Sequence, residues 1–397
     1  MTGTPATSVA SSSIAVAGWG SALPASRLTN QDLTLVLDTS DAWIVDRTGI
    51  RERWVAGPGE TTGPLSVQAG RAALARAGLT PADVDLVVVA TATPELPIPS
   101  TAALVAAELG IEAGGFDLNA ACAGFVYALT VTAGLLSVGA GRTALLIGAD
   151  TMTSVIDPQD RTTAILFGDG AAAVVLTTDP ALGVPGAAAG AGLAAGAAAG
   201  AAGPGLVASD LMHDPLGVDL LVVEAGGSRH PATAETVAAR AHYLRMDGQE
   251  VFRRAVRGIT LSVQRTLERA GARPEDVTLF VPHQANVRIV NAVLPRVGIP
   301  PERTLRTIDR YGNTSAASVP LSLAEVAESG RVGPGDLVLM CGFGAGMAVG
   351  TALWRWGTAA GASAAAPVPS SGSGSAAATP PAAAKPGPRA KAGEDAA

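Results

Sequence analysis

The sequence predicts a layered α/β fold made of two similar halves. Three segments recur in the same order along the chain: residues 74–93, 138–148 and 167–176 match residues 267–286, 332–342 and 343–353. The apolar stretches within them, LVVVA, ALLIG and LVLMCG, have almost no polar positions, which is typical of strands in sheets covered on both faces. Two such halves packed together give stacked layers of helices and sheets.

The first repeated pair shows the plan of each half. LARAGLTPADVDLVVVATAT begins at Leu74, and LERAGARPEDVTLFVPHQAN begins at Leu267. Each predicts an amphipathic helix ended by glycine, then a turn that contains proline, then a short apolar strand. The second pair, VGAGRTALLIG and VGPGDLVLMCG, and the third, FGDGAAAVVL and FGAGMAVGTAL, are expected to add the next strands of each half.

Composition narrows the class of protein. The chain has 397 residues, of which 48% are hydrophobic, 4% aromatic and 15% charged. A core of Ala, Val, Leu and Ile is therefore expected, and a solvated disordered body is excluded. The net charge of −7 argues against a general nucleic-acid binder. Two cysteines and four histidines without ligand spacing predict neither a disulfide scaffold nor a metal site.

Composition also suggests boundaries along the chain. The segment from Ala181 to Ser209 has no charge and many glycines, which disfavour a membrane helix and predict an inserted loop. The last 41 residues, rich in Ala, Pro, Ser and Gly, cannot bury enough apolar surface to order. The first basic residue is Arg27, so no secretory signal is expected and a cytoplasmic location is predicted. The expected segments are a flexible 1–13, a first half 14–180, an inserted loop 181–209, a second half 210–356 and a disordered tail 357–397.

Cys122 is the first candidate for chemistry. It lies in DLNAACAGFVYAL, where a strand ends and a helical pattern begins. The positive end of a helix dipole favours thiolate over thiol, and small neighbours leave room for a substrate. The alternative is a small cysteine buried in the core.

His283 and Asn313 are the other candidates. His283 closes the strand in FVPHQAN, where the first half has Ala90, so the second half carries a polar group that its twin lacks. It is a plausible hydrogen-bond donor or general base, or a histidine satisfied within the core. Asn313, in RYGNTSAASVPLSL, precedes a helix and would by itself be read as a helix cap. A Cys–His–Asn set can activate a thiol and stabilise an oxyanion, which also suits a papain-like cysteine hydrolase, although the sequence signature of that class is absent.

Several long motifs, in order, resemble the β-ketoacyl-acyl-carrier-protein synthase III family of the thiolase-like superfamily. They are DTSDAWIVDRTGIRER, FDLNAACAGFVYAL, DPQDRTTAILFGDGA, FVPHQAN and RYGNTSAASVPLSLAE, and the resemblance runs from about Ile14 to Trp356. It implies two α/β halves that form five layers, a homodimer, and no cofactor beyond the substrates acyl-CoA and malonyl-acyl carrier protein.

The resemblance also implies roles for residues. Cys122 would take an acyl group from acyl-CoA, and His283 and Asn313 would stabilise the enolate formed when malonyl loses carbon dioxide. The backbone N–H groups of Cys122 and Ala345 would form an oxyanion hole, although the family often has glycine at Ala345. Asn313 favours condensation, since related acyltransferases of secondary metabolism often place Asp there.

Further positions would bind the substrates. The resemblance assigns coenzyme A binding to Thr39, Trp43, Arg47, Arg161, Gly248 and Gln249. It assigns the acyl pocket to Phe252, Phe343 and Ile98, the last of these in the partner subunit's pocket, where the family often has Phe. Docking of an acidic carrier protein to an acidic enzyme needs a local basic patch, and the expected contacts are Arg253, Arg288, Arg296, Gln284 and Ala285.

Three other functions remain open on the sequence. A starter-unit acyltransferase or priming synthase of polyketide synthesis would use the same residues on another acceptor. A cysteine hydrolase would convert acyl-CoA to free acid without malonyl. A scaffold that uses the tail as a linker would not need Cys122.

Overall fold

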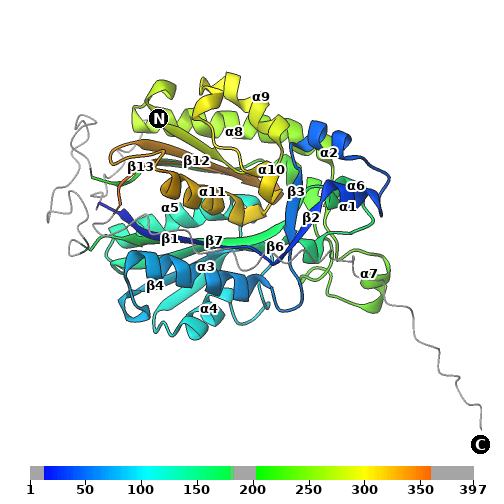
Figure 1. Cartoon of the computed structure of the whole chain (residues 1–397), viewed down its shortest axis with the longest axis horizontal. Coiled ribbons are helices and arrows are strands. Elements are labelled where there is room, and N and C mark those ends of the chain that lie inside the picture. The colour runs from blue at the N-terminus through cyan, green and yellow to red at the C-terminus, as the bar shows by residue number, and fades with distance from the viewer. Residues whose placement is uncertain (1–12, 180–181, 183–202, 359–397) are drawn as a thin grey trace, which may run out of the picture.

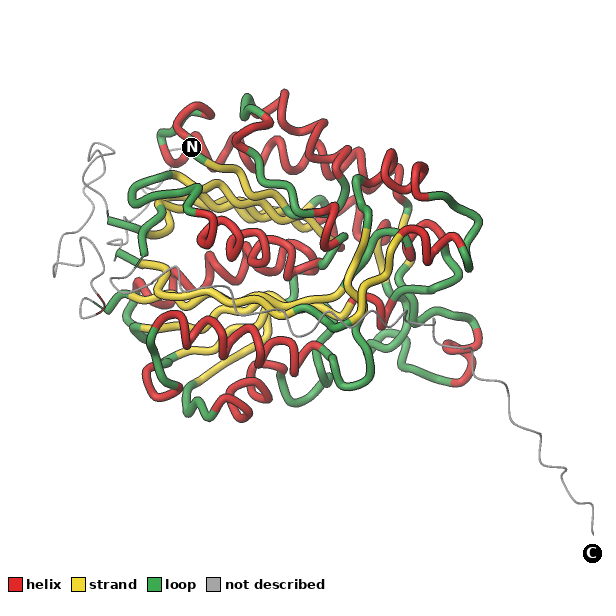
Figure 2. Tube along the Cα trace, viewed as in Figure 1, coloured by secondary structure: helices red, strands yellow, loops and turns green. Residues whose placement is uncertain are grey.

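The computed structural model describes residues 13–179, 182 and 203–358, and it has the predicted five-layered α/β architecture. Figures 1 and 2 show helices on both outer faces, a sheet beneath each set, and helices between the two sheets. The expected segments 1–12 and 359–397, and nearly all of 180–202, lie outside the described residues.

The first sheet, within the described residues, has the strand order β1-β7-β6-β4-β5. β4 pairs in parallel with β5 and β6, whereas β7 runs antiparallel to β6 and β1. Every residue of β6 and β7 is buried, because helices cover both faces. The strands are β1 (Ala15–Ala22), β4 (Leu86–Ala90), β5 (Gly114–Leu118), β6 (Thr143–Thr151) and β7 (Asp169–Thr177).

The second sheet repeats this topology. Its described strands have the order β11-β12-β13-β8, with β11 parallel to β12 and the other neighbours antiparallel. Where the first sheet has β5, the second has only an isolated parallel bridge between Phe280 and Thr304. The strands are β8 (Gly205–His213), β11 (Leu279–Pro282), β12 (Leu337–Gly344) and β13 (Ala348–Arg355).

The outer helices are also duplicated. α3 (Thr62–Ala77) and α4 (Thr101–Leu109) cover the first sheet, and α8 (Gly248–Ala270) and α9 (Val287–Val297) cover the second (Figure 1). α3 ends at Gly78 and α8 at Gly271, both in the left-handed conformation that favours glycine. The 3-10 turns η1 (Pro81–Asp83) and η6 (Pro274–Asp276) then lead into β4 and β11, as the first repeated pair predicts.

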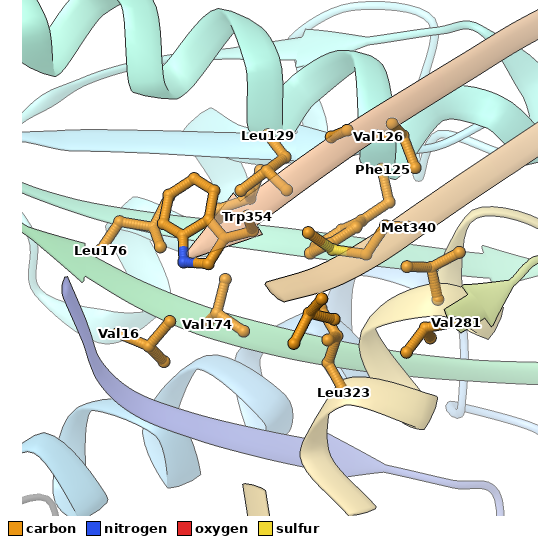
Figure 3. Close-up of a cluster of buried hydrophobic side chains, with 14 of the residues drawn as sticks. Val16, Phe125, Val126, Leu129, Val174, Leu176, Val281, Leu323, Met340 and Trp354 are labelled. Atoms are coloured by element: carbon orange, nitrogen blue, oxygen red, sulfur yellow. The ribbon is translucent and has the colours of Figure 1, made fainter. Parts of the chain in front are cut away.

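The central layer consists of α5 (Gly124–Ser137) and α11 (Ser318–Ser329). Both helices bury most of their residues, because each is packed between two sheets. Figure 3 shows their side chains meeting those of both sheets, so that one apolar cluster joins the halves. The cluster includes Phe125, Leu129, Val174, Leu323, Met340 and Trp354.

A cap inserted between β1 and α3 lies at one end of the layers (Figure 1). It contains β2 (Ser26–Thr29), α1 (Asn30–Thr34), α2 (Asp41–Thr48) and β3 (Glu52–Val55). Arg53 has no exposed surface and binds the carbonyl of Ile165 at 2.8 Å and Asn30 Oδ1 at 2.9 Å. Burial lowers the pKa of Arg53 to about 10, so the group stays charged at neutral pH. Arg53 thereby fixes the cap to the segment that follows α6 (Arg161–Ala164).

A second inserted segment, between β8 and α8, lies beside the cap (Figure 1). In this segment Arg240 forms an ion pair with Asp157, and the N–H of Leu244 donates to the carbonyl of Val155. These contacts bind the segment to the loop before α6. Its elements are η5 (Pro215–Leu220), β9 (Leu221–Val222), α7 (Ala234–Ala238) and β10 (Arg245–Met246). The second half also contains η7 (Pro301–Arg303), α10 (Ile308–Tyr311) and η9 (Ala345–Met347).

Two predicted boundaries were wrong. The inserted loop was expected to reach residue 209, but β8 begins at Gly205. The uncharged sequence gives no sign of this strand, because the strand forms by pairing with β13. The tail was expected to begin at Gly357, but Gly357 accepts a hydrogen bond from Val16 and Thr358 bridges to the same residue.

No helix of the described residues has the length and apolar character needed to cross a bilayer. Within the same residues, no group of three or more His, Cys, Asp or Glu side chains is arranged to hold a metal ion.

Candidate functional site

Cys122 lies on a tight elbow between strand and helix. β5 ends at Leu118, the 3-10 turn η2 (Ala121–Ala123) follows, and α5 begins at Gly124. Ala121 has a φ of +47°, which is rare for a residue with a side chain, and its N–H donates to Asn119 Oδ1 at 3.0 Å. This local hydrogen bond supports a conformation in which Cys122 sits at the start of α5.

Glycines of β12 allow this elbow to pack directly on the second sheet. A Cβ at Gly344 would lie 2.5 Å from the N atom of Cys122, and a Cβ at Gly342 would lie 2.7 Å from the Cα of Ala123. Both distances are shorter than real contacts permit, so any side chain at either position would displace the cysteine. Sequence analysis missed this role, although both glycines belong to repeated segments.

Asn313 lies on a second elbow with the same geometry. Ser315 has a φ of +51°, and its N–H donates to Asn313 Oδ1 at 2.9 Å. The turn η8 (Ser315–Ala317) then leads into α11. The elbow packs against Gly148 of β6, where a Cβ would lie 2.5 Å from the carbonyl O of Ala316.

The two elbows are equivalent positions of the duplication. NAACAG, from Asn119, corresponds to NTSAAS, from Asn313, and each elbow contacts the glycine of the other half's central strand. Cys122 therefore corresponds to Ala316. The shared Asn and the run of small residues are the sequence signal that would have revealed this second pair of repeats.

His283 follows β11 and is buried. Its backbone N–H donates to the carbonyl of Cys341 at 2.6 Å, and its ring Nδ1 is 2.5 Å from the hydroxyl of Ser318 in α11. Its Nε2 has no hydrogen-bond partner among the described residues. Burial lowers the pKa of His283 to about 3, so the ring is neutral at physiological pH. Ser318, which orients the ring, is a further functional residue that sequence analysis missed.

Cys122, His283 and Asn313 line one cavity of about 630 Å³. They come from three elements and from both halves, so the tertiary structure brings the three predicted residues together. The cavity is mostly apolar and extends towards the cap. Its other lining residues include Ile165, Phe167, Leu221, Met246, Val251, Ile289, Phe343 and Gly344.

The protonation state of Cys122 differs from the sequence prediction. Burial raises the pKa of the thiol to about 12, and the nearby charge of Asp150 acts in the same direction. The hydroxyl of Ser315 and the backbone N–H act in the opposite direction but are the weaker influences. The thiolate expected from the helix N-terminus was therefore wrong for the resting site, which holds a thiol.

An aromatic and cationic cluster lies at the cap end of the cavity. Trp43 of α2 has the guanidinium of Arg47 at 5.3 Å and that of Arg161 at 4.9 Å from its ring centroid. Such stacking on a flat ring suits an aromatic ligand base. Gly248 and Gln249, at the start of α8, also line the cavity, whereas Thr39 precedes α2 and is outside the lining.

The predicted acyl-pocket residues separate into two groups. Phe343 is buried and Phe252 half-exposed, and both line the cavity. Ile98 is 88% exposed on the loop before α4 and does not line the cavity of its own chain.

The predicted carrier-protein contacts differ in how exposed they are. Arg253 and Arg296 are exposed, and Arg288 reaches the cavity rim, where it forms an ion pair with Asp46 at 2.7 Å. Ala285 is half-buried in the cavity wall.

Gln284 is the exception, because it is buried and cannot meet a docking protein. Its amide donates to the carbonyl of Pro282 at 2.7 Å, and its Oε1 accepts from the N–H groups of Thr307 and Ile308. The side chain holds the segment before α10, a role that a motif match cannot distinguish from binding.

Comparison with known proteins gives consistent similarities. Residues 116–191 match the family model 3-oxoacyl-[acyl-carrier-protein (ACP)] synthase III, and residues 267–356 match the model of its C-terminal part. The chain is 46% identical over 344 residues to the β-ketoacyl-[acyl-carrier-protein] synthase III of Roseiflexus sp. (strain RS-1), covering 86% of this chain and 98% of that one.

Solved structures give the same result. The 3-oxoacyl-(acyl carrier protein) synthase III of Pseudomonas aeruginosa PAO1 is 42% identical with a TM-score of 0.74, covering 87% of this chain and 99% of that chain. The priming β-ketosynthase of the R1128 polyketide biosynthetic pathway is 36% identical with a TM-score of 0.75, covering 86% and 96%.

Alkylation of Cys122 by iodoacetamide should accelerate about tenfold for each pH unit between about pH 6 and pH 9, because only the thiolate reacts. Burial raises its pKa to about 12, so no plateau is expected in this range. Mass spectrometry of the Cys122 peptide gives the rate, and a Cys122→Ala variant reports any reaction at the buried Cys341. A plateau near pH 7 would instead indicate a resting thiolate stabilised by α5.

Proposed function

This chain belongs to the β-ketoacyl-[acyl-carrier-protein] synthase III family, and we propose that it joins an acyl-CoA primer to malonyl-acyl carrier protein through an acyl-Cys122 intermediate. It is an acyltransferase that begins fatty-acid synthesis by a decarboxylative condensation. The observation that carries the assignment of residues is the convergence of Cys122, His283 and Asn313 on one cavity.

The first half-reaction loads the enzyme. The Cys122 sulfur attacks the thioester carbonyl of acyl-CoA, the bond from that carbon to the coenzyme A sulfur breaks, and coenzyme A leaves with the proton as a free thiol. The oxyanion formed on the way would be held by the backbone N–H groups of Cys122 and Ala345. Gly344 supports this role, because any side chain at that position would lie against the Cys122 nitrogen.

The second half-reaction makes the carbon–carbon bond. Malonyl on the carrier protein loses carbon dioxide, and the electron pair of the broken bond becomes an enolate. The Nε2–H of His283 and the amide of Asn313 would donate to the thioester oxygen that carries this charge. The carbanion attacks the acyl-Cys122 carbonyl, the C–S bond to Cys122 breaks, and a β-ketoacyl carrier protein leaves. Because decarboxylation itself supplies the carbanion, we propose that no cofactor is required.

The structure supports His283 as a donor in preference to a base. Its unpartnered Nε2 is at the cavity, and its Nδ1 meets the Ser318 hydroxyl, which can accept or donate. With Ser318 donating, Nδ1 would be the acceptor and the proton would be on Nε2. A neutral ring with the proton on Nε2 is the form that can stabilise an enolate, and its low pKa prevents it from charging near neutral pH.

Coenzyme A is proposed to bind at the cap. The adenine would stack between Trp43 and Arg161, which contact each other in the unliganded chain, with Arg47 beside them. The pantetheine arm would then pass Gly248 and Gln249 towards Cys122 along the cavity. Since its substrates are carried by coenzyme A and by a carrier protein, the location we propose is the cytoplasm.

The acyl carrier protein is proposed to dock at the cavity rim near Arg288, with Arg253 and Arg296 on neighbouring helices. Arg288 is already paired with Asp46, so docking would exchange one carboxylate partner for another. Such exposed pairs contribute little stability, about 0–1 kcal/mol, and the exchange therefore costs little.

A homodimer is proposed from the edge of the first sheet. β5 is the outermost strand of that sheet and is half-exposed, with Ile98 and Leu96 exposed on the neighbouring loop. Unpaired strand edges are sites of chain association, and a two-fold pairing of β5 would carry Ile98 towards the partner. Light scattering should give the mass of two chains, and a single-chain mass at micromolar concentration would contradict the pairing.

A polyketide role is a second candidate, because a priming β-ketosynthase is 36% identical over most of its length. It would use the same two half-reactions on a different carrier protein. Comparing fatty-acid and polyketide carrier proteins as malonyl donors would distinguish the two pathways.

Loss of Cys122 and loss of the two donors should affect different half-reactions. With Cys122→Ala, no acyl adduct should form from any acyl-CoA, as measured by intact-protein mass spectrometry. With His283→Ala or Asn313→Ala, the adduct should still form on Cys122, whereas carbon dioxide release should fall by roughly 10²- to 10³-fold. Cys341→Ala is the control and should leave both steps intact. Loss of the adduct in the donor variants would contradict these roles.

The two binding surfaces should respond to different arginines. Arg161→Ala should raise KM for acyl-CoA without changing KM for malonyl-acyl carrier protein, and Arg288→Glu should do the reverse. The control Arg273→Glu removes an equally paired exposed arginine beyond the far end of the 23-residue α8, roughly 35 Å away, and should change neither value. Equal effects of Arg161→Ala and Arg288→Glu on both substrates would contradict separate surfaces.

A further inference from the structure

Asp150 is a buried carboxylate to which the reaction above gives no role. It lies near the end of β6, has no exposed surface, and is close enough to influence the pKa of Cys122. A buried charge is costly unless hydrogen bonds satisfy it. The donors that satisfy Asp150 come from both halves of the molecule.

One oxygen of Asp150 binds the segment that follows β4. Its Oδ1 accepts from the Thr91 hydroxyl at 2.9 Å, the Ala92 N–H at 2.7 Å, and both the N–H and the hydroxyl of Thr93 at 3.0 Å. The other oxygen, Oδ2, accepts from the N–H of Ala316 at 2.9 Å. The side chain thus connects the first half to the elbow of the second half.

That elbow carries Asn313 and leads to Ser318, which contacts His283. Asn313 is three residues before Ala316 and is held by the N–H of Ser315. Ser318 is two residues after Ala316 and contacts Nδ1 of His283. The hydrogen bond from Ala316 to Asp150 is therefore placed between the two residues that set the positions of Asn313 and His283.

The duplication shows which residue of the second half lies at the position equivalent to Asp150. Cys122 corresponds to Ala316, and the β12 residue that corresponds to Asp150 is Gly344. At the Cys122 elbow the N–H faces a glycine, which leaves space for the substrate oxygen. At the Ala316 elbow the equivalent N–H donates to Oδ2 of Asp150, an acceptor that the protein itself supplies.

We propose that Asp150 is a positioning residue for the condensation step, which closes the second elbow with its carboxylate and so holds Asn313 and His283 where the enolate oxygen forms. This inference rests on the proposed function, since it assigns a task within the second half-reaction. Asp150 touches no substrate and acts only through the elbow. The Cys122 elbow, which has its own support from Asn119, does not depend on the hydrogen bond between Ala316 and Asp150.

Asp150→Asn is the sharpest variant, because an amide has nearly the same shape but one acceptor oxygen instead of two. If that oxygen faces Thr91, Ala92 and Thr93, the NH2 group must face the N–H of Ala316, and two donors then oppose each other. If it faces Ala316, the donors on the other side lose their acceptor. Asp150→Ser, which is smaller and uncharged, removes the bridge without this donor conflict.

The matched control is Asp169→Asn. Asp169, in β7, is also fully buried and accepts from the N–H of Ala56 at 2.8 Å and from Thr153, but it does not contact the elbow. The Asp169→Asn variant therefore reports how the loss of a buried carboxylate in the same sheet changes the rates of the two half-reactions. Carbon dioxide release is expressed per acylated Cys122, so that a loss of folded enzyme cancels.

In both Asp150 variants the rate of Cys122 acylation by acyl-CoA should stay close to that of the native chain, and carbon dioxide release from malonyl-acyl carrier protein should fall by roughly 10- to 100-fold. Asp169→Asn should show no such split. The double variant Asp150→Asn/Asn313→Ala should be slower than Asn313→Ala by less than the full effect of Asp150→Asn, because without the Asn313 side chain Asp150 acts only through His283.

Equal losses in the two half-reactions, no loss in either, or an additive double variant would overturn the inference. These outcomes differ from failure of the proposed function, which would appear in the native chain as no Cys122 adduct or no carbon dioxide release.

Discussion

The close approach of each elbow to a glycine of the opposite sheet is the contact on which the site depends. Gly342 and Gly344 let the backbone of Cys122 lie against β12, and Gly148 does the same for Ala316 against β6. Because a Cβ at these positions would lie 2.5–2.7 Å from backbone atoms, the two halves can pack this closely only if these residues are glycine. This packing positions the elbows that carry Cys122 and Asn313 at the cavity.

Burial gives the site an uncharged resting state. The pKa of Cys122 is raised and that of His283 is lowered, both mainly by desolvation, so a thiol and a neutral imidazole line the same apolar cavity. Charge then appears only on the substrate oxygens during reaction. Fixed donors in a dry site stabilise such charge more strongly than they would in water, without needing to reorganise. A site of this kind is suited to a reaction whose electrons come from the substrate's own decarboxylation.

The two halves share one architecture, but their equivalent elbows carry different residues. Each has an elbow supported by an Asn side chain and a residue of positive φ, but one carries Cys122 and the other carries Asn313. The residue on the facing strand also differs, since Gly344 leaves an N–H open and Asp150 occupies the equivalent one. The two turns thus share one geometry and differ at a few buried positions, so that one carries the proposed nucleophile and the other carries one of the two proposed donors.

The sequence by itself determined the duplicated α/β plan, the glycine ends of α3 and α8, and the three candidate residues, because periodicity, turn chemistry and motif spacing are local properties. It did not determine the start of β8, which depends on pairing with β13, or the burial of Gln284, which depends on the segment before α10. It also predicted a thiolate at Cys122, because a helix N-terminus can be read from sequence and desolvation cannot. The roles of Ser318, Gly344 and Asp150 emerged only in the tertiary structure, since each acts on an atom more than thirty residues away along the chain.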